Sequence, residues 1–443
     1  MATVDRPAAD VSPARACAYR VIRRVFEQGA YADRAFHAEA SGLDSRERSF
    51  AMALAYAAVQ RRATLDYLIE RLAGRPMQQL EPSVLATLRL GLTQLLLLGG
   101  VAEHAAVDES VKLAKHDAPR AAGLVNAVMR RATRDGAAIL AELDDTTPER
   151  AALLRSVPVW LARLWFEELG ADQARALLAA VNEPAESALR VNTLVATVAD
   201  VRARLPVATL PAPGLAYGLV FDGPFDAHGS ELWARGAIMP QSRGSMMAAD
   251  ALEPQPGERL LDLCSAPGAK ATQLAALLAA DGAVVCVERN PRRADRLRRT
   301  LQRMHAADVA TVCVADAATA LDGNAAAFDR VLVDPPCSGL GTLQSRPDVR
   351  WRTSPERIAE TAALQARILQ AGAAAVRPGG VLVYSVCTIS RAEGETVVER
   401  FLARNGDFTP DPFERRDPGT SHLQLLPSVD RTDGFFIARF RRR

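Results

Sequence analysis

The sequence predicts a multidomain protein that joins an all-helical domain, a small α+β domain and an α/β domain with a parallel, doubly wound sheet. Three observations support this prediction. Up to about residue 135, apolar residues recur at helical spacing. In the middle of the chain, glycine and proline interrupt short apolar segments. After residue 241, short apolar strands alternate with helical segments.

The N-terminal domain, which we place at residues 1–140, has helical periodicity throughout. In 14–28 and 45–73, apolar residues lie three and four positions apart, and Ser45 is a candidate helix cap. Further helical segments with short connections are predicted at 82–98, 104–116 and 120–136. No stretch here has the pattern of a strand, so we expect a compact helical domain.

A polar, charged stretch at 140–152 is a candidate linker to a small α+β domain, placed at 145–240. Segment 186–206 has the pattern of a strand, a turn and a helix. Segment 214–241 is rich in glycine and proline, which predicts short strands joined by turns.

The third domain, at 241–443, contains five short apolar segments that we expect to form the parallel sheet. These predicted strands are 259–264, 283–288, 310–315, 330–336 and 380–387. Helical segments lie between most of them. In such sheets ligands bind beyond the carboxyl ends of the strands, so functional side chains are expected at those ends.

Composition limits the class of protein. The formal net charge is +2, which gives no overall basic field. The N-terminus lacks an apolar signal core, and the longest apolar run, 92–100, is far shorter than the ~20 residues of a membrane span. We therefore expect a cytoplasmic, monomeric protein without membrane association. The six cysteines include no CxxC pair, so no metal site is predicted.

The turn after the first predicted strand is a candidate ligand site. Pro267 and Gly268 impose a tight turn before a helix, without the GxGxxG pattern of dinucleotide sites. The next strand ends at Glu288, where an acid typically binds ribose hydroxyls, and the third is followed by Asp316. This arrangement suits a nucleoside without a phosphate chain, and S-adenosylmethionine better than NAD. The alternative is an ordinary turn with two solvated acids.

Two cysteines lie where predicted strands end. Cys337 follows Asp334 by three residues in a glycine loop, and Cys387 ends the strand 380–387. A thiol beside an acid suits nucleophilic catalysis. The alternative for a cysteine is a small buried hydrophobe. We apply that interpretation to the cysteines within helices or apolar strands, which are Cys17, Cys286 and Cys313.

Four segments together resemble the RNA 5-methylcytosine methyltransferases, and more narrowly the RsmB (Sun/Fmu) family of ribosomal RNA methyltransferases. They are DLCSAPGAK (262–270), DPPCSGLG (334–341), RPDVRW (346–351) and VYSVCTIS (383–390). Three helical segments, 88–98, 104–115 and 123–131, resemble NusB. The resemblance implies a NusB-like RNA-binding domain, an α+β domain that also contacts RNA, and a Rossmann-like, S-adenosylmethionine-dependent methyltransferase domain.

The resemblance also implies a reaction: methyl transfer to C5 of a specific cytosine in 16S ribosomal RNA, through a covalent cysteine–C6 adduct. Cys387 would be the nucleophile, Cys337 would help release the product, and Asp334 would lie near both cofactor and base. Glu288 would hold the ribose and Asp316 the adenine side. The methionine portion would lie on the turn formed by Cys264, Ser265, Ala266, Pro267, Gly268, Ala269 and Lys270.

Contacts with RNA are predicted just after the cysteine loop. Arg346, Arg350 and Trp351 combine charges for phosphates with a ring for stacking on a base. The basic stretch 289–303 is interpreted as a solvated helix face. Small-subunit ribosomal RNA is the expected partner. The alternatives are the same chemistry on transfer RNA and a non-catalytic RNA-binding or antitermination factor.

Overall fold

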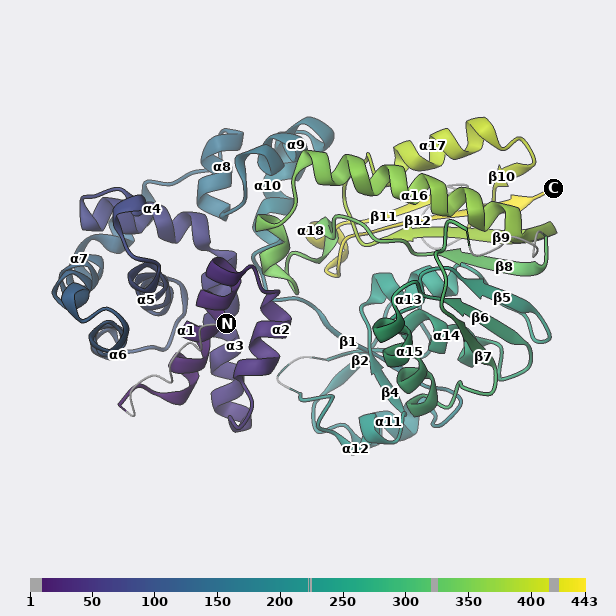
Figure 1. Cartoon of the computed structure of the whole chain (residues 1–443), viewed down its shortest axis with the longest axis horizontal. Coiled ribbons are helices and arrows are strands. Elements are labelled where there is room, and N and C mark those ends of the chain that lie inside the picture. Colours follow the sequence, from purple (N-terminus) through teal and green to yellow (C-terminus); the bar gives the residue numbers. More distant parts are fainter. Residues whose placement is uncertain (1–9, 222, 224, 320–325, 414–421) are drawn as a thin grey trace. The chain divides into compact units, whose positions relative to one another are not determined.

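A computed structural model describes residues 10–221, 223, 225–319, 326–413 and 422–443. The first nine residues of the predicted N-terminal domain lie outside the described residues. The chain divides into two compact units (Figure 1). The first consists of Met1–Glu183 and Leu343–Arg352, and the second of Pro184–Thr342 and Thr353–Arg443.

The first unit is helical, as predicted. Its longer helices are α1 (Pro13–Gln28), α2 (Ala32–Glu39), α3 (Ser45–Gln60), α4 (Arg62–Ala73), α5 (Pro82–Leu92), α6 (Glu103–Asp117), α7 (Ala122–Ala141), α8 (Pro148–Arg155), α9 (Val159–Leu169) and α10 (Ala171–Ala180). Shorter helical turns are Met77–Gln79, Pro119–Ala121 and Pro347–Trp351, and Thr93–Leu97 is π-helical. The cap of α3 is Asp44, whose side chain accepts from the Glu47 amide, so the predicted cap Ser45 is instead the first helical residue.

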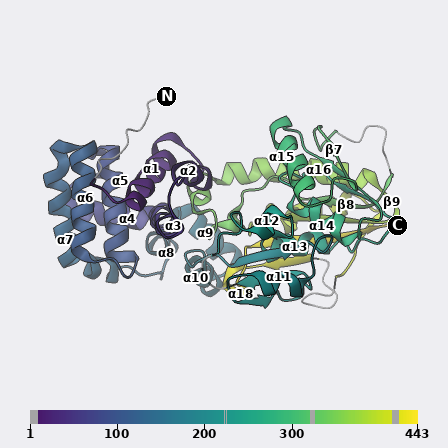
Figure 2. The ribbon, with the colours of Figure 1, turned by 90° about the horizontal axis from the view of Figure 1, so that it is seen from below.

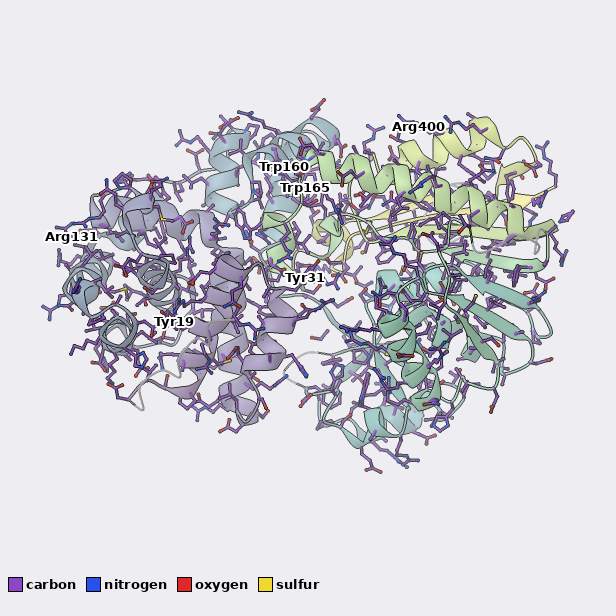
Figure 3. All side chains as sticks on the ribbon, viewed as in Figure 1. Tyr19, Tyr31, Arg131, Trp160, Trp165 and Arg400 are labelled. Atoms are coloured by element: carbon purple, nitrogen blue, oxygen red, sulfur yellow. The ribbon has the colours of Figure 1, made fainter. Side chains whose placement is uncertain are left out.

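Apolar faces hold this unit together. Helices α4 to α7 lie side by side in Figure 2, and α1 packs on α3 and α5. Helix α9 carries Trp165, labelled in Figure 3, whose side chain is fully buried. Helices α8 to α10 belong to this unit, although their residues fall within the α+β domain predicted at 145–240. The boundaries 1–140, 145–240 and 241–443 therefore stay a prediction.

The second unit begins with a small antiparallel sheet of order β2-β3-β1-β4. Its strands are β1 (Ser187–Val191), β2 (Thr209–Pro211), β3 (Gly218–Phe221) and β4 (Ile238–Pro240). The short helices α11 (Val198–Arg204) and α12 (Glu231–Ala234) accompany it. The strand, turn and helix predicted for 186–206 correspond to β1 and α11. Leu189, Val201 and Ile238 share the buried core of this sheet.

The large sheet has the order β10-β12-β9-β8-β5-β6-β7. The five predicted strands are β5 (Arg259–Asp262), β6 (Ala283–Val287), β7 (Ala310–Cys313), β8 (Phe328–Val333) and β9 (Val376–Val386), and they are parallel. The C-terminal segment adds antiparallel strands beside β9, so the complete sheet is mixed. These strands are β10 (Phe408–Pro410), β11 (His422–Leu425) and β12 (Phe435–Arg442).

Helices cover both faces of this sheet (Figure 1). Side chains of α13 (Arg243–Asp250), α14 (Ala269–Leu277) and α15 (Pro291–Arg303) share one buried core with the sheet. Those of α16 (Pro355–Ala375) and α17 (Glu395–Arg404) share a core on the opposite face. The alternation of side chains along each strand supplies both cores, as in β8, where Leu332 faces one and its neighbours Val331 and Val333 face the other.

Two shorter helical segments, Leu340–Thr342 and α18 (Pro427–Asp430), complete the second unit. None of the helices in the described parts of the chain combines the length and apolar character needed to cross a bilayer. Strand order reverses between β5 and β8, since β6 and β7 extend to one side and β9 to the other. Such a reversal is where open α/β sheets bind their ligands.

Candidate active site

The two cysteines predicted to react lie together beyond the carboxyl ends of two neighbouring strands of the large sheet. Strands β8 and β9 are parallel neighbours, so the residues after them emerge side by side. Cys387 directly follows β9, and Cys337 lies four residues beyond the end of β8. Their Sγ atoms are 3.3 Å apart, and both cysteines are half-buried and not joined in a disulfide. Two sulfurs at this distance cannot both carry a charge at low cost, so the pair holds one thiolate at most.

The environment of Cys337 favours its protonated form. A hydrogen bond with Cys387, then burial, then the charges of Cys387 and Glu393 raise the pKa of the Cys337 thiol well above its ordinary value. At neutral pH this group is therefore a thiol.

The three cysteines predicted to be small buried hydrophobes lie in different environments. Cys17 and Cys286 are buried, but Cys313 is exposed, because it ends the edge strand β7.

Asp334 links the cysteine loop to the turn after β5. Its Oδ2 atom lies 2.7 Å from Lys270 Nζ, and its Oδ1 atom accepts a hydrogen bond of 2.9 Å from Ser385 Oγ. Burial lowers the pKa of Lys270, but the Asp334 carboxylate outweighs it, so the pKa is raised and the ammonium stays charged. The site therefore holds a fixed cation and a fixed anion next to the thiols.

The predicted turn from Cys264 to Lys270 joins β5 to α14 and includes the first two residues of that helix. Gly268 caps α14 with φ +111°, and a Cβ there would lie 2.8 Å from the Leu297 side chain, so glycine is required on both counts. The Ser265 amide donates to the carbonyl of Val287 at the end of β6. Burial raises the pKa of the Cys264 thiol, which makes Cys264 unreactive.

The predicted ribose and adenine acids follow β6 and β7 at the same edge. Glu288 is buried; its Oε1 accepts from the Asn290 amide at 2.8 Å, and its Oε2 lies 3.1 Å from the Arg293 guanidinium. Asp316 is exposed and accepts from the Ala318 amide at 2.9 Å. A backbone amide two residues further along the chain therefore orients each of the two carboxylates.

Asp262, at the end of β5, is a site residue that sequence reasoning missed. Its side chain is 1% exposed, and Oδ2 has no hydrogen-bond partner among the residues described. Burial, followed by the negative charge of Asp334, raises the Asp262 pKa to about 7. A buried acid at a strand end with one oxygen that lacks a partner indicates a ligand site. Its place directly before the Cys264 turn was the available signal.

Arg350 and Trp351 do not fit the RNA contact predicted for them. Arg350 is fully buried in the first unit, where its guanidinium donates to the Ser156, Val181 and Leu343 carbonyls at 3.1–3.2 Å. Trp351 is half-buried and its Nε1 donates to the Val59 carbonyl at 2.7 Å. These groups are bound by the fold. Of the predicted set only Arg346 is exposed, and it stays a predicted contact.

Three family models match successive parts of the chain. The model described as NusB family matches residues 12–134, and the RsmF/B-like, ferredoxin-like domain matches 157–228. The model described as 16S rRNA methyltransferase RsmB/F matches 249–441. The predicted order of a NusB-like domain, a small α+β domain and a methyltransferase domain is confirmed.

Relatives match nearly the whole chain. It is 34% identical to the "Probable ribosomal RNA small subunit methyltransferase B" of Synechocystis, covering 97% of this chain and 99% of that one. It is 38% identical to the "Ribosomal RNA small subunit methyltransferase B" of Thermus thermophilus, covering 90% and 89%. A solved structure named PH0851 shares the fold, with a TM-score of 0.81, 24% identity and coverage of 97% and 99%. The chain belongs to the 16S rRNA methyltransferase RsmB/F family.

Proposed function

We propose that this chain transfers a methyl group from S-adenosylmethionine to C5 of a cytosine in 16S ribosomal RNA, through a covalent bond between Cys387 and C6 of the base. The observation that carries this proposal is the pair of thiols, 3.3 Å apart, at adjacent strand ends. Relatives named as small-subunit ribosomal RNA methyltransferases support the substrate class.

The residues at the strand ends fit the methyl donor, which when bound supplies an electrophilic methyl group on a sulfonium. The turn from Cys264 to Lys270 would hold its methionine portion, with backbone amides of α14 facing that turn. The unpartnered Oδ2 of Asp262 offers an acceptor beside the same turn. Glu288 would bind the ribose hydroxyls and Asp316 the adenine side.

The first step is the addition of the Cys387 thiolate to C6 of the base. The new bond pushes electron density toward C5, which then forms a bond to the methyl group as the methyl–sulfur bond breaks. Charge that develops at N3 needs a hydrogen-bond donor, and the Lys270–Asp334 pair supplies one beside the thiols. A base inside an RNA helix cannot reach this position, so the target nucleotide must be turned out of its stack.

Release requires loss of the C5 proton and cleavage of the Cys387–C6 bond. Cys337 suits this later step because its thiol is held protonated before the reaction. Once Cys387 is bonded to the base, it no longer carries a charge next to Cys337. Cys337 can then release its proton to water and, as the thiolate, accept the C5 proton, after which the Cys387–C6 bond breaks and Cys387 leaves as the thiolate.

The test uses cysteine-to-serine variants with RNA and labelled methyl donor. Cys387→Ser should abolish methylation and form no adduct, because a serine hydroxyl is far less ionised than a thiol. Cys337→Ser should stall after attack and remain attached to RNA in a denaturing gel. The double variant should lose that adduct.

An adduct in Cys387→Ser and none in Cys337→Ser would exchange the two roles. Separate assays with 16S ribosomal RNA and with transfer RNA distinguish the proposed substrate from its alternative. Methylation of transfer RNA alone would overturn the substrate assignment while leaving the chemistry in place.

A further inference from the structure

Glu393, just before α17, carries a fully buried carboxylate that takes no part in the steps above. Its Oε1 accepts from the Ser338 amide at 2.8 Å, Thr361 Oγ1 at 2.7 Å and Gln365 Nε2 at 3.0 Å. Its Oε2 accepts from Ser338 Oγ and from Thr388 Oγ1, the latter at 3.1 Å. Among the residues that the structure describes, no basic side chain pairs with it, so neutral donors alone stabilise the charge.

Two of these donors are the residues that directly follow the reactive cysteines. Ser338 follows Cys337, and Thr388 follows Cys387. Their hydroxyl oxygens are 2.8 Å apart, and both bond to the same carboxylate oxygen. One carboxylate therefore joins the loop after β8 to the segment after β9 at the point where the two thiols face each other.

The same network fixes both segments to rigid elements. Gln365, on α16, also donates to the carbonyl of Pro336, the residue before Cys337. Tyr384, on β9, donates its hydroxyl to the Glu393 backbone carbonyl at 2.5 Å. Burying a carboxylate without a cation costs free energy even when donors surround it, so stability alone does not account for this arrangement.

We infer that Glu393 is a positioning residue, which holds Cys337 and Cys387 at the separation that lets both thiols act on one base. This inference rests on the proposed methyl transfer. Positioning on this scale is sufficient to affect catalysis, because a 1 Å misplacement of a reacting group can cost about 100-fold in rate. The negative charge of Glu393 also contributes to the raised Cys337 pKa, after Cys387 and burial.

The test is Glu393→Gln, which preserves shape but replaces one acceptor oxygen with an amide nitrogen. We expect kcat to fall roughly 10–100-fold, with KM for the methyl donor unchanged. A second readout needs neither RNA nor methyl donor: the pH profile of alkylation of each cysteine, measured by peptide mass spectrometry. Removing a negative charge near Cys337 lowers its pKa, so its alkylation should begin at lower pH. The other ionisable groups around the thiols are Asp334, Lys270 and Tyr384.

Glu395→Gln is the matched control, because Glu395 is the first residue of α17, two positions after Glu393, and pairs with the exposed Arg391. Unchanged kcat and an alkylation profile equal to that of this control would overturn the inference. If Glu393→Gln does not fold, Thr361→Val removes one donor to the carboxylate but keeps its charge, and should lower kcat by a smaller factor. A wild-type kcat in Thr361→Val would then count against the inference. If the wild type methylates no RNA, the proposed function fails, and the alkylation profile still reports on Glu393.

Discussion

Burial and the neighbouring negative charge of Asp334 both raise the pKa of the Asp262 carboxyl group. The group lies at the end of β5, and within the described part of the chain only its Oδ1 atom has a hydrogen bond, from the Cys264 amide at 3.3 Å. Its pKa of about 7 lies above the ordinary value of 3.8. The folded chain therefore holds a proton on Asp262 over a pH range in which the unfolded chain has released it.

This difference predicts a pH-dependent contribution to stability. Below about pH 4 the contribution of Asp262 to the free energy of unfolding is fully present, and this contribution is lost as the pH rises to about 7. Asp262→Asn cannot titrate. The free energy of unfolding of the wild type, minus that of the variant, should therefore increase by roughly 2–3 kcal/mol between pH 7.5 and pH 5. Urea titrations of the ligand-free protein at several pH values measure it.

Asp281→Asn, at an exposed position, is the control. Its wild-type-minus-variant difference in the free energy of unfolding should stay constant between pH 7.5 and pH 5. A wild-type-minus-variant difference for Asp262 that stays constant across this pH range would show that the carboxyl group is not held protonated.

At the scale of elements, the segment Leu343–Arg352 combines two neighbouring arginines with different environments. It belongs to the helical unit, although it follows the cysteine loop in sequence. Arg352 lies over the ring of Tyr31, labelled in Figure 3, at 3.9 Å. Arg350 donates to Asn182 Oδ1 at 2.8 Å as well as to the three carbonyls. The segment is therefore held by the buried guanidinium of Arg350 and by the exposed Arg352, which lies on Tyr31.

Arg350→Met should destabilise the helical unit by about 2–4 kcal/mol, because several buried acceptors lose their donor. Arg346→Met, at an exposed position, should change stability by no more than about 0.5 kcal/mol. It should instead weaken RNA binding and reduce the slope of log affinity against log salt by about 1. Thermal unfolding and RNA titrations at several salt concentrations measure both. If Arg350→Met weakened RNA binding and Arg346→Met lowered stability instead, Arg350 would again be the candidate RNA contact.

At the scale of the whole molecule, each of the two units has its own core, and α8 to α10 belong to the first unit. Helices α8 to α10 pack with the first unit: Thr64 Oγ1 donates to the Leu153 carbonyl at 2.7 Å, and Ser156 Oγ accepts from the Ala63 amide at 2.9 Å. A cut in the stretch at 140–152 therefore removes packing partners from residues that stay behind.

A chain that starts at residue 146 should still bind S-adenosylmethionine with an affinity within about threefold of the full chain, because the methyltransferase unit has its own core. Its RNA affinity should fall and its salt dependence should flatten, since basic side chains of the NusB-like segment are lost. Calorimetry and RNA titrations check both. RNA binding equal to that of the full chain would show that the NusB-like segment is not an RNA-binding arm.

The sequence by itself determined the order of architectures, the five parallel strands and the placement of Cys337, Cys387 and Asp334 at the ends of strands. These features follow from periodicity and from turn residues, which are local properties of the chain. The Cys264–Lys270 turn was recognisable for the same reason, because its proline and glycine constrain the backbone where they stand.

Only the tertiary structure decided which of these side chains meet and which are buried. Cys337 and Cys387 are 50 residues apart in sequence, and their 3.3 Å separation depends on β8 and β9 being neighbours. The burial of Arg350, the unpartnered oxygen of Asp262 and the donors around Glu393 likewise depend on residues that are distant in the chain. Desolvation and hydrogen bonding are set by what surrounds a group in space, which no local pattern of residues specifies.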